Sequence, residues 1–138
     1  MKSGKLSILL AVIALLVSTL ACAVGNSDPV LDNIRTAHDQ DGNSPTTIFA
    51  VSDTVYVVSD LSNGKVGDII TSNWYVVNAE GLQSNSLIDS AEINVNEEPF
   101  NGTVYFYFPP GNGWPTGTYK VEVLFNGVLI NTVNFTVQ

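Results

Sequence analysis

The residues best suited to chemistry in this sequence form a short acidic turn. Asp39, Asp41 and Asn43 alternate as in the first half of a calcium-binding loop, and Gly42 supplies the tight turn that such a loop needs. The full loop also needs a carboxylate at its far end, and residues 44–51 contain none. The pattern therefore favours a solvated acidic turn. Calcium is the alternative, and no other cofactor is indicated.

Aromatic side chains are the second group of candidates. The run at residues 103–108 must place rings on both faces of a strand, so Tyr105 and Tyr107 could line a ligand groove. Trp114 could stack on a sugar ring or a peptide. Its context, Trp-Pro-x-Gly-x-Tyr, also has a structural explanation: a turn followed by a strand whose first ring, Tyr119, hydrogen-bonds back to the corner. The structural role is the favoured interpretation for Trp114, and ligand binding is the alternative.

Catalytic groups are hard to find. His38 is the only histidine, and no Gly-x-Ser-x-Gly sequence marks a serine nucleophile. One histidine and one cysteine cannot build a zinc cluster or a copper site of the cupredoxin kind. The carboxylates Asp89, Glu92, Glu97 and Glu98 could pair as the acid and base of a glycosidase, but their spacing gives no sign of it. We therefore expect a protein that is not an enzyme.

The N-terminal segment resembles an export signal. Lys2 and Lys5 precede an uncharged apolar run, residues 6–24, which ends in the small residues Ala21, Cys22 and Ala23. A basic head, an apolar middle and a small-residue end are typical of a secretory leader. Residues 1–23 are therefore predicted to be a helical signal peptide or membrane anchor. The protein is expected to be exported, either to the cell envelope or into the medium.

Three outcomes are open for Cys22, the only cysteine. It could become the lipid-bearing N-terminus of a lipoprotein, since Ala21 is small, although Thr19 stands where leucine is favoured. Ordinary cleavage after Ala23 would remove it. A retained segment would form an anchor or a pilin-type helix, because 19 residues at about 1.5 Å each just span about 30 Å of hydrocarbon. Lipid attachment at Cys22 is the favoured interpretation.

Charge narrows the range of partners. The chain has 13 acidic and 5 basic residues, and Lys2 and Lys5 lie in the leader. Such an acidic surface repels nucleic acid and anionic lipid headgroups. Nucleic acid is therefore not expected as a partner, and contact with the membrane is expected only through the N-terminal anchor.

A period of two dominates the rest of the chain and predicts short strands. Residues 24–44 are read as a polar tether in which a first strand could begin near residue 30, and residues 45–138 as the folded domain. The Asn126-Gly127 pair between two alternating runs predicts a hairpin. An irregularity near Ser72 and Asn73 suggests a bulge. The expected strands are at residues 30–37, 47–51, 54–61, 68–78, 87–95, 103–108, 118–125 and 128–137.

Seven or eight such strands without a helix predict an all-β fold, an antiparallel sandwich of two sheets. Apolar residues that alternate with polar ones should point into its core, because successive side chains of a strand point to opposite faces. The residues predicted to fill the core are Val55, Val57, Trp74, Val121, Val123, Phe125, Val133 and Phe135.

The C-terminal third carries a more specific pattern. Residues 114–123 read W-P-T-G-T-Y-K-V-E-V, Asn126-Gly127 follows, and the last strand ends in Phe135-Thr136-Val137. This pattern, with residues 39–42, 53–56 and Trp74, resembles small immunoglobulin-like domains of bacterial and archaeal surface lipoproteins. The resemblance implies an immunoglobulin-like sandwich and export, and it implies no activity or functional residue.

Two functions follow from these expectations. The first is a non-catalytic binding or interaction module at the cell surface, whose partner would be an envelope protein or glycan. The second is a structural subunit of a pilus or extracellular filament, with strands exchanged between copies. A hydrolase that uses the scattered carboxylates is the least favoured of the classes considered.

Overall fold

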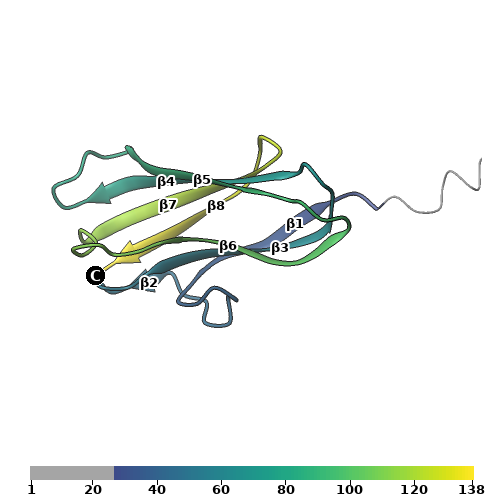
Figure 1. Cartoon of the computed structure of the whole chain (residues 1–138). Helices are drawn as coiled ribbons and strands as arrows, with labels where there is room; N and C mark the ends of the chain where they lie inside the picture. Colours follow the sequence, from purple (N-terminus) through teal and green to yellow (C-terminus); the bar gives the residue numbers. More distant parts are fainter. Residues whose placement is uncertain (1–26) are drawn as a thin grey trace, which may run out of the picture.

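The computed structural model describes residues 27–138, which form two sheets of β-strands (Figure 1). The helix predicted for residues 1–23, together with Cys22, lies outside the described residues. Within residues 27–138, no helix is long and apolar enough to cross a membrane. The strands are β1 (Val30–Ala37), β2 (Ile48–Phe49), β3 (Val55–Gly64), β4 (Ile69–Ala79), β5 (Leu87–Asn94), β6 (Phe100–Phe108), β7 (Gly117–Phe125) and β8 (Val128–Val137).

The two sheets pack face to face as a sandwich (Figure 1). One sheet has the strand order β1-β3-β6 and the other has the order β2-β8-β7-β4-β5. All neighbours are antiparallel except β2 and β8, which run parallel, with Ile48 opposite Thr136 and Phe49 opposite Val137. The predicted all-β, two-sheet sandwich is therefore confirmed, with eight strands. The expectation of antiparallel pairing throughout is wrong at β2, because the chain crosses to the other sheet after β1 and keeps its direction.

Alternation along the strands builds the core. In β7, Tyr119, Val121 and Val123 are buried, whereas Lys120 and Glu122 between them are partly exposed. Burying an apolar side chain of this size stabilises the fold by about 1.5–3 kcal/mol. Six of the predicted core residues are buried: Val55, Val57, Trp74, Val121, Val123 and Phe135. The other two, Phe125 and Val133, are partly buried and pack against this core.

The hairpin predicted at Asn126-Gly127 joins β7 to β8. Its two central residues have φ values of 49° and 81°, as a two-residue turn with positive φ at both positions requires. The Asn126 side chain accepts a hydrogen bond from the Ile69 backbone at 2.8 Å and donates one to the Asp68 carboxylate at 3.0 Å. The turn is therefore fixed to the start of β4.

The irregularity predicted near Ser72 lies slightly further along β4. The register with β5 shifts between Trp74 and Tyr75, and the register with β7 shifts between Val76 and Asn78. The pairing at Ser72 and Asn73 is regular on both sides.

Candidate functional site

Three tyrosines gather on the outer surface of the three-stranded sheet. β3 and β6 are antiparallel neighbours, in which Tyr56 lies opposite Tyr107 and Val58 lies opposite Tyr105. Since Val57 fills the core, the alternation of side chains turns Tyr56 to the outside. We call Tyr56, Tyr105 and Tyr107 the tyrosine face.

The rings of the tyrosine face lie close together. The ring centroids are 6.0 Å apart for Tyr56 and Tyr107, 6.1 Å for Tyr56 and Tyr105, and 6.4 Å for Tyr105 and Tyr107. These separations are within the usual range for aromatic pairs. Tyr105 is 39% exposed and Tyr107 58% exposed, so both rings reach solvent. The sequence identified Tyr105 and Tyr107 as candidates, but Tyr56 joins them only through the pairing of two distant strands.

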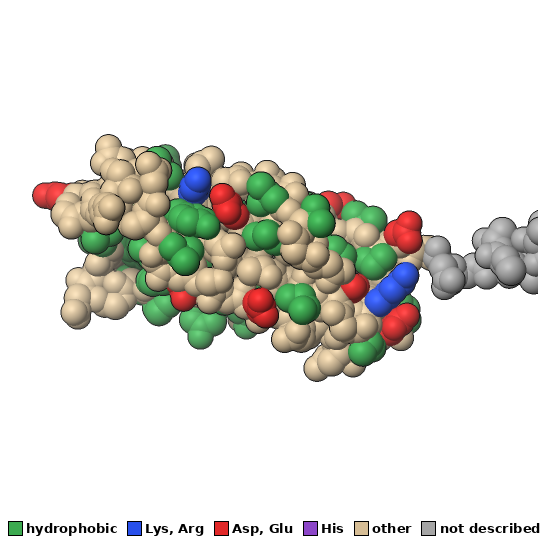
Figure 2. Space-filling view, turned by 90° about the horizontal axis from the view of Figure 1, so that it is seen from above, with side chains coloured by type: hydrophobic (Ala, Val, Ile, Leu, Met, Phe, Trp, Pro, Cys, Tyr) green, Lys and Arg blue, Asp and Glu red, His purple; other side chains and the backbone are tan. Residues whose placement is uncertain are grey.

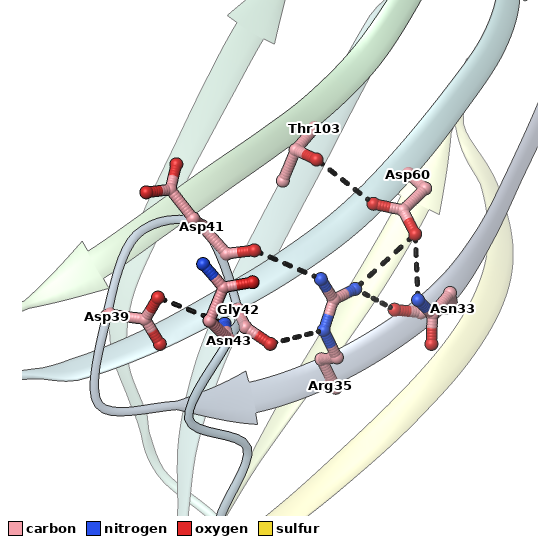
Figure 3. Close-up of polar contacts among 8 residues, drawn as sticks. All are labelled: Asn33, Arg35, Asp39, Asp41, Gly42, Asn43, Asp60 and Thr103. Carbon is pink, nitrogen blue, oxygen red and sulfur yellow. Dashed lines mark hydrogen bonds and ion pairs between the residues drawn. The ribbon is translucent and has the colours of Figure 1, made fainter.

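A polar network centred on Arg35 lies on the same sheet (Figure 3). Arg35 is in β1, opposite Val58, which itself lies opposite Tyr105. The Arg35 Nη1 atom donates to the Asn33 carbonyl at 2.8 Å and lies 3.6 Å from an oxygen of the Asp60 carboxylate. Arg35 thus connects the outer rows of β1 and β3 beside the tyrosine face.

Asp60 completes this network from β3. Its carboxylate accepts a hydrogen bond from the Asn33 side chain at 2.7 Å and one from the Thr103 hydroxyl at 3.2 Å. The hydrogen bond from Asn33, and then the positive charge of Arg35, hold the pKa of the Asp60 carboxyl below its ordinary value, while partial burial opposes them. Asp60 is therefore ionised at neutral pH, and the ion pair with Arg35 persists there.

Hydrogen bonds to its own backbone organise the acidic turn of residues 39–44. The Asp39 carboxylate accepts from the backbone N–H groups of Asn43 at 3.0 Å and Ser44 at 2.8 Å, which lowers the pKa of Asp39. Arg35 donates to the backbone carbonyls of Asp41 and Gly42, each at 3.2 Å. The guanidinium therefore occupies the carbonyl oxygens that a cation in this turn would use.

The candidate calcium ligands Asp39, Asp41 and Asn43 do not converge on one point. Figure 3 shows the carboxylate of Asp41 pointing away from that of Asp39. In the part of the chain that the structure describes, no group of three or more His, Cys, Asp or Glu side chains could hold a metal ion. Arg35 holds the turn through the Asp41 and Gly42 carbonyls, and calcium binding by Asp39, Asp41 and Asn43 stays a prediction.

Trp114 lies in the core rather than on the surface. It is 6% exposed, and its indole Nε1 donates to the Asp53 carbonyl at 3.0 Å. Its ring centroid is 4.9 Å from that of Phe108 and 5.1 Å from that of Tyr119. The favoured structural interpretation fits this placement, whereas a stacking platform for a ligand does not.

Tyr119 forms the predicted corner at the start of β7. Its hydroxyl donates to the Pro115 carbonyl at 2.6 Å, four residues back along the chain. This is the geometry of a tyrosine corner, in which a ring at the start of a strand fastens the preceding turn. Burial raises the pKa of the Tyr119 phenol, because the ionised form would lose hydration.

The other titratable candidates lie apart from the tyrosine face or on exposed elements. The His38 Nδ1 atom is 3.8 Å from the Asp53 carboxylate, and the His38 ring packs edge-on against Phe49 with 5.0 Å between centroids. The carboxylates considered for acid–base chemistry are all exposed, on β5 or in the loop that follows it: Asp89, Glu92, Glu97 and Glu98. These positions suit solvated charges.

Acidic side chains dominate the charged surface. Figure 2, seen from above the view of Figure 1, shows basic side chains lying beside acidic ones and apolar side chains scattered between them. Lys120 Nζ lies 3.8 Å from the Glu122 carboxylate, and Arg35 is similarly engaged with Asp60. Over residues 27–138 the surface therefore has no basic stripe of the kind that binds nucleic acid.

Comparisons with known proteins relate this chain to others by fold. No protein-family model matches the sequence, and no curated protein matches it. An immunoglobulin-like protein from Pseudomonas aeruginosa superimposes on 81% of this chain and 98% of its own length, with a TM-score of 0.54 and 16% identity. A β-glucosidase from Listeria innocua matches 82% of this chain, with a TM-score of 0.52 and 14% identity. An alkylpurine DNA glycosylase from Pseudomonas fluorescens matches 82%, with a TM-score of 0.50 and 8% identity.

The chain is thus a small β-sandwich domain that resembles immunoglobulin-like domains. It spans 16% of the matching β-glucosidase chain and 31% of the glycosylase chain, so in those proteins a similar sandwich is one part of a larger chain. Identities this low show the fold alone. The immunoglobulin-like resemblance inferred from the sequence is confirmed at that level.

Proposed function

We propose that this protein is an exported, non-catalytic binding module of the cell envelope, and that the tyrosine face makes the contact. The observation that supports the proposal is the grouping of three tyrosine rings on one outer sheet surface, with Tyr105 39% and Tyr107 58% exposed. The partner is an envelope protein or glycan. Cys22 carries the lipid that holds the module at the membrane.

Tyrosine suits such a contact for physical reasons. Its ring covers a large area, yet only two side-chain torsions become ordered on binding, and its hydroxyl can form hydrogen bonds with a polar partner. Here two paired strands already hold the rings, so little additional ordering is required. Arg35, Asp60 and Thr103 provide charged and hydroxyl groups next to the rings.

The fold comparisons are consistent with an accessory role. Similar sandwiches form 16% of a β-glucosidase chain and 31% of a glycosylase chain. Since a fold does not by itself carry a function, the role proposed here rests on the tyrosine face and not on the sandwich. We propose a binding module rather than an enzyme because the chain has a single histidine, His38, and because its candidate carboxylates on β5 and in the loop after it are exposed and lie apart from the tyrosine face.

The test is a binding screen with a matched variant. The full chain, kept in mild detergent, is applied to arrays of envelope glycans and to envelope protein extracts. A ligand of the tyrosine face should bind at least tenfold more weakly to a Tyr105→Ser/Tyr107→Ser variant. Leu129→Ser is the control, since Leu129 is 53% exposed on β8 in the other sheet. Specific hydrolytic turnover, or equal binding by both variants, would contradict the proposal.

The fate of Cys22 is tested separately by the mass of the mature N-terminus. A diacylglyceryl group on Cys22 is expected. A chain that begins at Val24, or one with an uncut leader, would reject the lipid anchor without affecting the binding role.

A filament subunit is the second candidate, and one observation favours it. β8 pairs with β2 only at Thr136 and Val137, so the rest of its outer side lacks a strand neighbour within residues 27–138. The exposed residues 128–130 on this strand are all apolar. Analytical ultracentrifugation of the full chain at high concentration tests this candidate. Concentration-dependent polymers that Leu129→Lys abolishes would support it, and a monomer at every concentration would reject it.

A further inference from the structure

β6 is an unprotected edge strand. It pairs only with β3 among the described strands, and its outer side therefore presents unpaired backbone N–H and C=O groups. Residues 102–108 pair with residues 55–61 in an unbroken register, so this edge is regular. Residues 100–108 contain no charged side chain and no proline. Proteins usually block a long regular edge with such residues or with a bulge, because an open edge pairs with other chains.

Other edges of the sandwich are protected in these ways. β1 has a register shift between Asp32 and Arg35, where Asn33 takes a φ of 51°, and it carries charged side chains. β2 is only two residues long. β5 carries Asp89 and Glu92, both exposed. β8 is also open over residues 128–135, but its register with β7 shifts between Leu129 and Asn131. Among the longer edges of the described strands, β6 alone combines an unbroken register with the absence of charged side chains.

A cavity of about 300 Å³ lies beside this edge. Its lining consists of Trp74, Ala91, Tyr105, Phe106 and Tyr107, which come from β4, β5 and β6. It therefore opens between the last strands of the two sheets, with a core tryptophan in its wall. A cavity of this volume is about ten times the share of one water molecule in the liquid, so apolar side chains can enter it.

A strand added to β6 would use both of its faces. It would lie about 4.8 Å from β6, and its side chains would point alternately outward and inward. One set would extend the tyrosine face next to Tyr105 and Tyr107. The other set would enter the cavity against Trp74 and Ala91. The backbone hydrogen bonds would supply affinity, and the cavity would supply selectivity for the inserted side chains.

Charge further defines the added strand. In the β4–β5 pair, Trp74 lies opposite Asp89 and Ser72 lies opposite Ala91. Directly opposite residues share a face, and Trp74 and Ser72 are buried, so Asp89 and Ala91 lie on the core-facing side of β5. Asp89 is exposed, and it lies directly opposite Trp74, one of the residues that line the cavity. The chain is also strongly acidic, with 13 acidic against 5 basic residues. A basic side chain on the incoming strand would be attracted to the Asp89 carboxylate.

We propose that the β6 edge binds an extended segment of a partner protein. On the face of this segment that enters the cavity, the side chains are apolar except for one lysine or arginine, which faces Asp89. This inference rests on the proposed binding role and assigns its partner to proteins rather than glycans. The segment becomes a fourth strand of the β1-β3-β6 sheet.

The test uses a synthetic peptide and the isotope-labelled full chain in mild detergent. The probe is Thr-Val-Thr-Lys-Thr-Val-Thr, which places Val, Lys and Val on one face. At ten times its Kd, the peptide should slow amide hydrogen exchange about tenfold at alternate residues of β6, because only those N–H groups face the edge. Exchange in β8 should not change. A peptide with N-methylated backbone amides should not bind, since it cannot pair.

Two variants test whether the peptide binds at the cavity and beside Asp89. Ala91→Phe fills the cavity and should weaken binding at least tenfold. Asp89→Asn, an exposed and structurally mild change, should remove the preference for the lysine peptide over its glutamate counterpart, a preference of at least fivefold in the unmodified chain. Ile48→Ser, at a 52% exposed position on β2 in the other sheet, is the matched control and should bind normally. Protection in β8 instead of β6, binding unaffected by both variants, or a dimer of this chain paired through β6 would each overturn the inference.

The result is separable from that of the proposed function. If Tyr105→Ser/Tyr107→Ser abolishes binding to a glycan while no peptide protects β6, the strand-addition inference fails and the binding module stands. If peptide binding and envelope binding are both unaffected by changes at the tyrosine face and at Ala91, both proposals fail.

Discussion

The core and the tyrosine face both consist of aromatic rings, but they differ in how their polar atoms are satisfied. In the core, Trp74 Nε1 donates to the Ser72 hydroxyl at 3.0 Å, Trp114 Nε1 donates to a backbone carbonyl at 3.0 Å, and the Tyr119 hydroxyl does so at 2.6 Å. Each buried polar atom needs such a partner, because leaving it unpaired is costly. On the tyrosine face the rings are solvent-accessible, and water can form hydrogen bonds with their hydroxyls.

This difference separates the rings on which the stability of the fold depends from rings whose surface is open to solvent. A core ring cannot be replaced without a cavity and an unpaired polar group. A ring on the tyrosine face can be replaced at little cost to the fold, because water already covers part of it. Aromatic content alone therefore says little about function in this chain, and the face on which a ring lies decides its role.

The largest expected change in the free energy of unfolding comes from replacing one ring in each of the two regions. Trp114→Ala should lower the free energy of unfolding by about 3–5 kcal/mol, because it opens a cavity and leaves the Asp53 carbonyl without its donor. Tyr107→Ala, at a 58% exposed position, should lower it by no more than about 1 kcal/mol, the usual size of the cross-strand pair with Tyr56 that it removes. Urea unfolding of the full chain in mild detergent measures both. Equal losses would break the distinction between the two regions.

A smaller effect is expected from a single hydroxyl. Tyr119→Phe should cost about 0.5–1.5 kcal/mol, since it removes the hydrogen bond to Pro115 and keeps the ring. Tyr107→Phe is the matched control and should be close to neutral.

The same hydroxyl predicts a response to alkaline pH. Because burial raises the pKa of Tyr119, its stabilising contribution is complete below about pH 10, the ordinary tyrosine pKa, and is lost as the pH rises through the folded-state value. The unmodified chain should therefore lose stability relative to Tyr119→Phe at high pH. Unfolding free energies measured at neutral and alkaline pH provide the test, and parallel pH profiles would contradict it.

The smallest effect concerns the polar network at the tyrosine face. The pKa of Asp60 is lowered by Asn33 and Arg35, so its contribution is present above about pH 4 and is lost as the pH falls through the lower folded-state value. Asp60→Asn should therefore flatten the stability profile in acid. The change should be small and should weaken with salt, since the Asp60 side chain is 38% exposed. Glu92→Gln, at an exposed position, is the control, and an equal flattening there would reject the assignment to Asp60.

Features that depend on local patterns were predictable from the sequence. Alternation identified the buried faces of β3 and β7, because a two-residue period is a property of each strand alone. The Asn126-Gly127 hairpin was predictable since both central residues must adopt positive φ, and these two residue types do so readily. The corner at Tyr119 followed from Pro115 and Gly117 within one short segment.

Features that depend on distant pairing were not predictable. Tyr56 joins Tyr105 and Tyr107 only because β3 pairs with β6 in one particular register. The network at Asp60 joins residues 43 positions apart, and no sequence pattern near Arg35 indicates it. The acidic turn resembled half of a calcium loop because the residues that carry its oxygen atoms are visible in the sequence. The hydrogen bonds from the Arg35 guanidinium to the carbonyls of this turn are visible only in the structure. The parallel placement of β2 was missed for the same reason.

The parallel pair of β2 and β8 has a mechanical consequence. Figure 1 places the start of the described chain and its C-terminus at opposite ends of the molecule. Tension along this axis would draw β2 toward its own start and β8 toward its end. The bonds from the Thr136 and Gln138 N–H groups to the carbonyls of Thr47 and Phe49 lie across that direction. These bonds would be loaded together in shear rather than opened one after another. The short β2–β8 pair would therefore resist stretching more strongly than its length suggests.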